Sequence, residues 1–386
     1  MAHYFIFPEK DTTIYSHPTR QSINTGIDEL LTIRDEQSFT DNNYYPSRIL
    51  IQFKNSEIND TINNKSNAKI TASLKLFQTE HKELSIDQHL EIYPLAESWV
   101  NGTGRLDNSP IITDGASWLY RDGSENAVKS GAIGTFWNTG SLPTGTTGSW
   151  TDNAPGGGIW YTGSGFEVER SYGYGDDLDI SLDITIPVIK HYSASNDSAT
   201  YPNGITNNGF ILKRSGSQEF TAISDGELNF FSLDTHTIYP PYLDIAWDDS
   251  NYDTDEAIDS KILKTGEIYV TLRNNKEEFK AIEEPKFRLN VRELYPTRRF
   301  VTSSNFLDVK YFTSDSYYSL IDYDTEETII PFGPTSKLSA DSEGMYFKLY
   351  MNGLQEERYY KLLFKHENND GIRVYDENCY FKIVKS

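Results

Sequence analysis

Aromatic side chains in a glycine-rich stretch are the residues whose type and spacing best suit recognition chemistry. Between about residues 100 and 175 the chain is dense in Gly, Ser, Thr and Asn, yet it holds several Trp and Tyr residues. A flexible linker would not keep so many Trp residues, because linkers lack residues that gain from burial. We therefore expect long, ordered loops. The candidate partner or glycan contacts are Trp118, Tyr120, Trp137, Trp150, Trp160 and Tyr161.

These rings have two interpretations. They anchor the loops onto a core or contact a protein partner, since a buried Trp removes roughly 150–250 Å² of surface from water. Alternatively, rings exposed on such loops stack on sugars. We favour anchoring or protein contact.

A second group of residues has the chemistry of a calcium site. Carboxylate and amide oxygens alternate at four positions, but the EF-hand pattern also needs Gly at its sixth position and Glu at its twelfth. Thr254 and Ser260 stand there instead, so that pattern fails. A looser oxygen cage for Ca²⁺ is the alternative to a solvated turn, and the weak candidates are Asp249, Asn251, Asp253 and Asp255, with a second cluster at Asp176, Asp177 and Asp179.

Catalytic signatures are missing from the sequence. It contains no G-x-S-x-G, H-E-x-x-H, G-x-x-x-x-G-K-[ST] or G-x-G-x-x-G pattern. We expect no enzyme activity and no cofactor. A glycan-degrading enzyme stays open as a third alternative, because its carboxylate pair is defined in space and the 57 acidic residues offer many pairs.

The net charge limits the classes of partner that the chain can bind, and the cysteine content indicates the compartment in which it assembles. The net charge of −22 repels nucleic-acid phosphates and anionic lipid, so we expect neither nucleic acid nor membrane as a partner. Cys379 is the only cysteine, so no intrachain disulfide can form, which favours assembly in a reducing cytoplasm. The first residues show no signal-peptide pattern, and no apolar run approaches a membrane span of roughly 20 residues.

The elements that would position these residues are mainly strands. Hydrophobic residues alternate with polar ones in several runs, which predicts half-buried strands. Sustained helical periodicity is scarce, and we expect short helices only at Thr25–Leu31 and Ala96–Val100. Strands without intervening helices predict an all-β sandwich fold. The predicted strands of the first half cover residues 48–53, 68–77, 177–186, 209–212 and 242–247.

An acidic, turn-rich stretch at residues 248–256 is the best domain boundary. Behind it, roughly seven more alternating runs in about 120 residues suit a smaller immunoglobulin-like β-sandwich. The predicted division is a first domain at 1–247, an acidic linker at 248–264 and a second domain at 265–386.

The order of landmarks along residues 10 to 247 resembles DNRLRE-type β-sandwich modules. The resemblance implies a jelly-roll-like fold for the large first sandwich, in modules of extracellular and phage structural proteins without a known catalytic site. This chain departs from the pattern by a long insert around residues 103–155. The landmarks that carry the resemblance are residues 11–15, 24–26, 31–33, 47–53, 72–76, 99–102, 156–160, 183–185, 203–204, 209–212 and 240–243.

The whole chain also resembles virion structural proteins of marine tailed bacteriophages, of the cyanophage type, through residues 317–322, 329–332 and 352–360. This resemblance implies a non-enzymatic tail, neck or baseplate component of the virion, assembled in the host bacterial cytoplasm. It would act through protein–protein docking with other virion proteins and with copies of itself. The alternative function is a carbohydrate-binding adhesin that recognises host-surface glycans through the loop aromatics.

Overall fold

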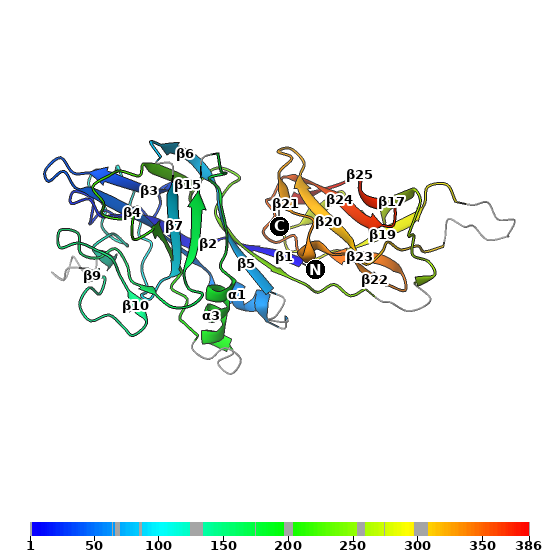
Figure 1. Ribbon diagram of the computed structural model, residues 1–386, viewed down its shortest axis with the longest axis horizontal. Coiled ribbons are helices and arrows are strands. Elements are labelled where there is room, and N and C mark those ends of the chain that lie inside the picture. Colours follow the sequence, from blue (N-terminus) through cyan, green and yellow to red (C-terminus); the bar gives the residue numbers. More distant parts are fainter. Residues whose placement is uncertain are drawn as a thin grey trace. The chain divides into compact units, whose positions relative to one another are not determined.

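The chain is mainly β in its computed structural model, which describes residues 2–63, 65, 70–84, 87–123, 134–173, 175–196, 204–252, 259–273, 275–296 and 308–385. Strands make up 45% of it, and the described residues form two helices. Several antiparallel sheets are present, and one of them is a curled half-barrel (Figure 1).

The chain divides into two compact units. The larger unit comprises residues 6–64 and 71–244, and the smaller unit comprises residues 1–5, 65–70 and 245–386. The start of the predicted linker hydrogen-bonds within the smaller unit: the Ala340 backbone N–H donates to the carbonyl oxygen of Asn251 (3.0 Å).

An eight-stranded antiparallel sheet dominates the larger unit, with the order β12-β7-β14-β4-β3-β15-β6 and with β2 paired to β4. Its central strand β4 contains the predicted strand at residues 48–53. The bounds are β2 Pro8–Tyr15, β3 Leu30–Gln37, β4 Tyr44–Phe53, β6 Gln78–Lys82, β7 Gln88–Pro94, β12 Val168–Tyr172, β14 Phe210–Arg214 and β15 Glu227–Phe231.

The centre of this sheet is buried on both faces. All five residues of β14 are buried, and so are most residues of β4. Strands buried on both sides lose the simple alternation of apolar and polar residues, and polar side chains on them must find partners inside the protein. Arg48, Lys213 and Arg214 are such side chains.

The remaining strands before residue 248 belong to three smaller sheets. A four-stranded sheet has the order β1-β16-β5-β13, and two short hairpin-like pairs, β8–β9 and β10–β11, lie within the 100–175 insert. The predicted strand at residues 242–247 coincides with β16. The bounds are β1 Ala2–Ile6, β5 Ile70–Leu76, β8 Tyr120–Asp122, β9 Thr135–Phe136, β10 Thr146–Thr147, β11 Trp160–Tyr161, β13 Ile180–Asp183 and β16 Tyr242–Trp247.

Neither predicted helix exists. Residues 25–29 and 96–100 form turns and irregular backbone, and Leu30 and Leu31 begin β3. The cause is tertiary hydrogen bonding to the insert. The Ile27 N–H donates to the Gly104 carbonyl (3.1 Å), and the Val100 N–H donates to the Arg121 carbonyl (3.0 Å), so these donors are not available to a local helix.

The two helices of the described residues are α1 (Asn55–Ile62) and α3 (Thr185–Asn196), and they contact each other (Figure 1). The predicted strand at 177–186 is therefore correct only at residues 180–183, which form β13; residues 177–179 are irregular and the helix begins at Thr185. The Asp183 carboxylate accepts the Thr185 backbone N–H (2.9 Å), and Pro187 follows in the first helical turn, where it needs no N–H partner.

Two sheets form the smaller unit. One has the order β17-β19-β23-β22, and the other has the order β18-β25-β24-β20-β21, in which β18 pairs in parallel with β25. A 3₁₀ turn, η3, covers Pro334–Ser336. The bounds are β17 Ile268–Arg273, β18 Glu278–Lys280, β19 Lys286–Glu293, β20 Ser316–Asp322, β21 Thr328–Ile330, β22 Ser339–Asp341, β23 Gly344–Lys348, β24 Tyr359–Asn368 and β25 Gly371–Val384.

Aromatic rings from both sheets meet in the core of the smaller unit. Phe287 on β19 contacts Phe279 on β18 (centroids 5.4 Å apart) and Phe381 on β25 (5.9 Å). Phe347 on β23 stacks on Tyr318 of β20 at 4.3 Å. These rings are almost fully buried, so the two sheets pack against each other through a shared aromatic layer.

Candidate interaction surfaces

Three of the six predicted aromatic contacts are buried anchors of the insert. Trp118, Trp137 and Trp160 have at most 3% of their surface exposed and belong to one core cluster with residues of the central sheet. The indole N–H of Trp118 donates to the Ala154 carbonyl (3.0 Å), and that of Trp137 donates to the Ser117 carbonyl (2.9 Å). These rings therefore fix the loops to the core and cannot stack on an external ligand.

Arg48 links the sheet to the insert. Its guanidinium is fully buried and binds both carboxylate oxygens of Glu219 (2.8 Å each). It also donates to the carbonyl oxygens of Gly157 (2.5 Å) and Ser149 (2.6 Å). Because one planar group holds a carboxylate and two separate loop positions, Arg48 fixes the geometry of the insert.

The same guanidinium lies against two of the buried indoles, 4.5 Å from the Trp118 centroid and 5.1 Å from that of Trp160. Gly157 has φ +81°, and a Cβ on it would lie 2.6 Å from the Trp118 ring and 2.7 Å from an Arg48 nitrogen. Glycine is therefore required where the loop meets this pair. We call Arg48, Glu219, Gly157, Trp118 and Trp160 the Arg48 clamp.

A second buried cation extends the network. The Lys213 ammonium lies 2.7 Å from Glu91 and 3.7 Å from Glu219. The Glu91 carboxylate also accepts the Tyr93 hydroxyl (3.2 Å), and burial raises the pKa of that hydroxyl. Each charge is balanced inside the protein, as buried charges must be. The network stabilises structure and presents no accessible reacting group.

The other three predicted contacts are only partly buried. The Tyr120 and Phe136 rings are in contact at a tilt of 35° with centroids 4.6 Å apart, and Phe136 is 49% exposed. Tyr161 contacts Phe166 at 6.0 Å, and Trp150 is half-buried against the loop. A partner protein or a glycan can reach these rings. We call Tyr120, Phe136, Trp150, Tyr161 and Phe166 the insert rings.

Arg48, Glu219 and Phe136 were not predicted as functional residues from the sequence. A signal for Arg48 was present: it alternates with Leu50 in an apolar run, which places both side chains on the same buried face. Nothing in the sequence distinguishes Phe136 from a core aromatic residue.

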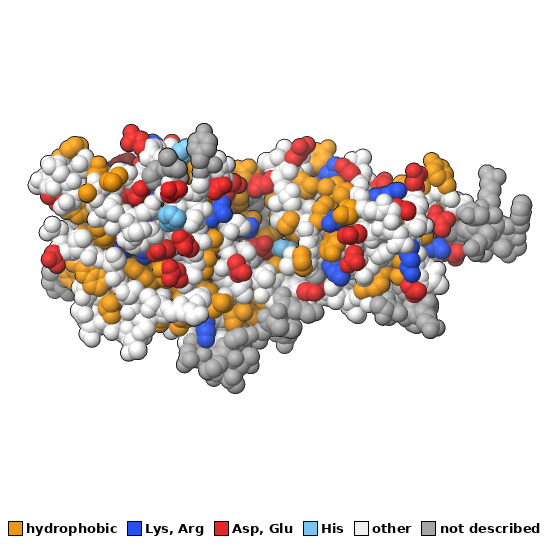
Figure 2. All heavy atoms as spheres, in the orientation of Figure 1, with side chains coloured by type: hydrophobic (Ala, Val, Ile, Leu, Met, Phe, Trp, Pro, Cys, Tyr) orange, Lys and Arg blue, Asp and Glu red, His pale blue; other side chains and the backbone are white. Residues whose placement is uncertain are grey.

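The outward face of the five-stranded sheet in the smaller unit is the second candidate surface. Alternate residues of β24 and β25 point away from the core, and Ile372, Val374 and Tyr380 are 60%, 53% and 45% exposed. Figure 2 shows apolar and basic side chains gathered where Figure 1 places β20 and β24. We call the set on these strands the lysine–apolar face; it consists of Tyr317, Ile321, Lys361, Leu363, Lys365, Ile372, Val374 and Tyr380.

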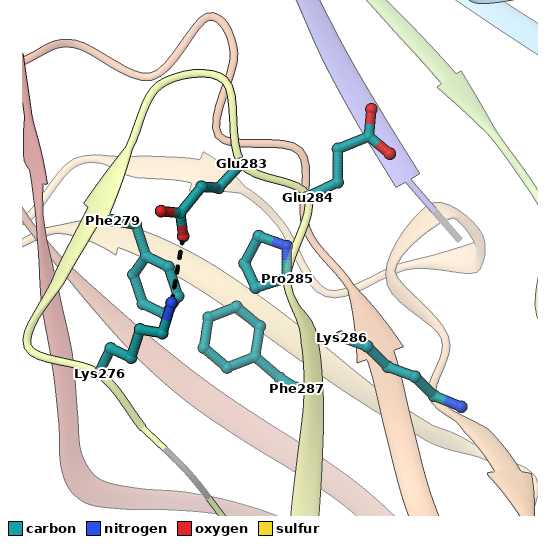
Figure 3. A pocket seen from close by; sticks show the side chains of 7 residues that line it. All are labelled: Lys276, Phe279, Glu283, Glu284, Pro285, Lys286 and Phe287. Carbon is teal, nitrogen blue, oxygen red and sulfur yellow. Dashed lines mark ion pairs between the residues drawn. The ribbon is translucent and has the colours of Figure 1, made fainter. Parts of the chain in front are cut away.

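A shallow pocket of about 340 Å³ lies beside the β18–β19 loop (Figure 3). Phe279, Pro285 and Phe287 form its apolar part, while Lys276 and Glu283 form an ion pair (3.6 Å) at one side. Both rings are nearly fully buried core residues, so the pocket is a dent over the core.

The calcium candidates show no ligand cage among the residues that the structure describes. Asp253 and Asp255 lie outside the described residues, and the backbone N–H of Asn251 donates to the Ser339 hydroxyl (3.1 Å). In the second cluster, Asp176 accepts the Gly173 N–H (2.8 Å) and Asp179 accepts the Gln78 N–H (2.7 Å). The described part of the chain holds no group of three His, Cys, Asp or Glu side chains suited to a metal ion.

Several carboxyl groups in the larger unit have raised pKa values, with burial as the first cause, and three of the shifts are large. The pKa is about 7 for Asp11, about 6 for Asp28 and about 6 for Asp35. Asp11 accepts the Leu233 N–H (2.7 Å), and Asp35 lies 3.2 Å from Arg214. Asp11 and Asp35 are thus buried among structural partners.

Comparisons with known proteins identify no family. No family model matches the chain, and no curated protein matches it. Among solved structures, one match is the β-glucuronidase of Parabacteroides merdae with glycerol in its active site, at 11% identity and a TM-score of 0.14. The match covers 96% of this chain and 35% of that enzyme, so this chain spans about a third of its length, and so low a score supports no statement on fold or function. Within the described residues no helix is long and apolar enough to cross a membrane.

Proposed function

We propose that this chain is a non-enzymatic structural protein of a tailed-phage virion, a tail, neck or baseplate component that docks on other virion proteins and on copies of itself. The Arg48 clamp is the observation that carries the proposal. It fixes the long insert onto the central sheet through a fully buried ion pair and two loop carbonyls. Loops held rigid before binding lose less conformational entropy on docking, which favours a surface made for a protein partner.

We also propose the finer fold. The larger unit would be a jelly-roll-like sandwich of the DNRLRE type, which its antiparallel strands support. The smaller unit would be an immunoglobulin-like sandwich, which is supported by two sheets sharing an aromatic layer. Such paired sandwiches suit a protein whose role is to hold loops and sheet faces in fixed positions.

The negative net charge supports a protein as the partner. A net charge of −22 disfavours contact with nucleic acid and anionic lipid and leaves proteins as partners. The proposed location is the assembled particle. The proposed docking requires no cofactor, and a Ca²⁺ site at Asp249, Asn251, Asp253 and Asp255 stays a prediction.

The test is whether the chain copurifies with phage particles. Particles purified by density gradient from cultures of the encoding phage are analysed by quantitative mass spectrometry, with the major capsid protein as the internal reference. We expect a fixed copy number per particle that survives a second gradient. A chain that stays in the soluble lysate, or whose ratio to the capsid protein varies between preparations, contradicts the proposal.

The second candidate is a carbohydrate-binding adhesin, which the insert rings favour. The contacting rings of Tyr120 and Phe136 are partly exposed, and so is Trp150 in the same insert. Glycan-array binding that is lost in Trp150→Ala or Phe136→Ala, but kept in Ile223→Ala on another exposed loop, would establish this function. Absence of glycan binding by the wild-type protein excludes the adhesin for the glycans on the array.

A further inference from the structure

Asn–Gly dipeptides occur four times in the sequence, and such dipeptides are the usual sites of spontaneous deamidation. Glycine has no side chain to hinder its backbone nitrogen, so this nitrogen can attack the side-chain amide carbon of the preceding Asn. Three of the four dipeptides lie wholly within the described residues, at 101–102, 208–209 and 352–353. Their surroundings differ, and the surroundings decide which Asn side chain can react.

Two of these dipeptides are held in place within the larger unit. The Asn101 side chain is half-buried and donates to the Gly26 carbonyl oxygen (2.6 Å). Asn208 is only 8% exposed, and the Gly209 N–H donates to the side-chain oxygen of Asn207 (3.1 Å). Because the glycine nitrogen and the Asn side chain must rearrange to meet, packing and hydrogen bonds protect both positions.

The third dipeptide forms the corner of an exposed turn in the smaller unit. The Leu354 N–H donates to the Met351 carbonyl oxygen (3.1 Å), and Gly353 has φ +90°, as the third position of a type II turn requires. Asn352 is exposed, and the Gly353 N–H has no hydrogen-bond acceptor among the described residues. Of the three dipeptides, this one is held least by its own surroundings.

Strand β1 packs on this turn. The Asn352 amide donates to the Tyr4 hydroxyl, and the Tyr4 ring contacts Tyr350 with centroids 6.2 Å apart. A Cβ on Gly353 would lie 2.5 Å from the Phe5 Cβ, so the two backbones are in close contact. While β1 is in place, it therefore restrains both the amide and the backbone that would react with it. A terminal strand opens at low free energy, and opening removes this restraint.

We propose that Asn352 is a deamidation site whose rate is controlled by the packing of strand β1. The Gly353 nitrogen attacks the side-chain amide carbon of Asn352 and loses its proton. The new C–N bond closes a succinimide ring, and the side-chain nitrogen leaves as ammonia. Water then opens the ring at one of its two carbonyl carbons and gives aspartate or isoaspartate.

Isoaspartate adds one methylene to the backbone of the turn. The close contact between Gly353 and Phe5 depends on the backbone path of this turn, so isoaspartate removes the surface on which β1 packs. The reaction would thus convert a reversible opening of β1 into a lasting one. This site does not depend on the role of the chain in a virion.

Peptide mapping by mass spectrometry tests the proposal, after the full-length protein is incubated at mildly alkaline pH. In urea-denatured protein, Asn101, Asn208 and Asn352 should react at similar rates, because each is followed by Gly. In the folded protein, Asn352 should react at least about tenfold faster than the other two, since a terminal strand opens at lower free energy than the interior of a sheet.

The variant Tyr4→Phe keeps the ring but removes the acceptor of the Asn352 amide. It should speed deamidation of Asn352 by about threefold to tenfold, the effect of one hydrogen bond on a local opening, and leave Asn208 unchanged. The matched control Tyr295→Phe changes a ring that is 80% exposed in the same unit, and it should leave the Asn352 rate unchanged. Thermal melting confirms that both variants are folded.

Three results overturn the inference. One is a folded wild-type protein in which Asn352 reacts no faster than Asn208. Another is an Asn352 rate in Tyr4→Phe equal to that in Tyr295→Phe. The third concerns the product: isoaspartate protein, separated by ion exchange, should exchange the backbone amide hydrogens of residues 2–6 faster than unreacted protein, and equal exchange would show that the reaction does not release β1.

Discussion

Arg48 is the residue whose removal should affect the insert most. Arg48→Met keeps the length of the side chain but leaves the buried Glu219 carboxylate without its bidentate partner. Breaking a buried ion pair from one side costs roughly 3–5 kcal/mol, and we expect about 3 because Lys213 stays 3.7 Å from Glu219. Urea denaturation measures the loss, and limited proteolysis should cleave near Ser149 and Gly157 faster than in the wild-type protein.

The matched control is Arg105→Met. Arg105 pairs with Glu29 at 3.7 Å, and both side chains are about half exposed. Such a surface pair contributes roughly 0–1 kcal/mol. An Arg48→Met protein with the stability and protease resistance of Arg105→Met would contradict the anchoring role of the clamp.

Replacing a buried and a half-buried tryptophan of the insert by Ala should lower the stability of the protein by different amounts. Trp137→Ala empties a site that is 2% exposed and removes the hydrogen bond to Ser117, so we expect a loss of about 3–5 kcal/mol. Trp150 is half-buried, and Trp150→Ala should cost clearly less. Thermal and urea unfolding of both variants checks the ranking. Equal losses would mean that the two rings do not divide into anchor and contact.

His191 on α3 gives the fold a dependence on acidity. Its ring is fully buried against Phe210, and neither ring nitrogen has a hydrogen-bond partner among the described residues. Burial lowers the pKa of His191 to about 3, below its usual value of 6.5. Between these values the unfolded chain binds a proton that the folded chain does not, so stability is full above about pH 6.5 and falls as the pH drops toward 3.

His191→Leu should remove this dependence. Below pH 6 the difference in free energy of unfolding between wild type and variant should shift in favour of the variant, by up to about 1.4 kcal/mol per pH unit. The raised pKa of Asp11 acts in the opposite sense, lowering stability as the pH rises from about 4 to 7, but it is common to both proteins and cancels. Parallel stability–pH curves would show that His191 does not titrate as the structure indicates.

At the level of elements, the strands were predictable because hydrophobic alternation survives wherever one sheet face is exposed. The predicted strand at residues 242–247 coincides with β16, and residues 70–76 of the predicted strand at 68–77 form β5. The prediction failed where local pattern and tertiary contacts compete. The turns at residues 25–29 depend on carbonyls of the insert, which lie about 80 residues away in sequence.

The prediction failed for a different reason at the start of α3. The alternating residues before it end at Asp183, and Asp183 followed by Pro187 is a helix-start signal that the uninterrupted alternation concealed. The insert rings were predictable as a group, but burial separated the anchors from the accessible rings. That division depends on the Arg48 clamp, whose carboxylate partner is 171 residues from Arg48 in sequence.

Strand β1 should stabilise the smaller unit although it lies at the other end of the chain. Within that unit Phe5 is 4% exposed and the His3 ring is 3.0 Å from the Thr335 hydroxyl. Deleting residues 1–5 should lower the stability of the smaller unit by at least about 2 kcal/mol, the value of one buried aromatic side chain. Calorimetry should show one transition shifted and the other unchanged. A shift in the transition of the larger unit alone would contradict the division into units.

At the scale of the whole molecule, charge and sheet architecture point to docking. The sequence predicted the acidic balance and the β class, and both describe the protein as a whole. It could not predict which surfaces stay exposed, because exposure depends on the register that sets Lys365 beside Val374 and on loops that the clamp holds. The insert rings and the lysine–apolar face are the two surfaces where we expect partners to bind.

A map of the intact particle at side-chain resolution is the decisive measurement for the virion assignment. The proposed function predicts density for this chain at fixed, repeated positions, with neighbouring protein packed on the insert rings or on the lysine–apolar face. Particles without this chain, or a chain in the map whose insert rings and lysine–apolar face all point into solvent, would contradict it.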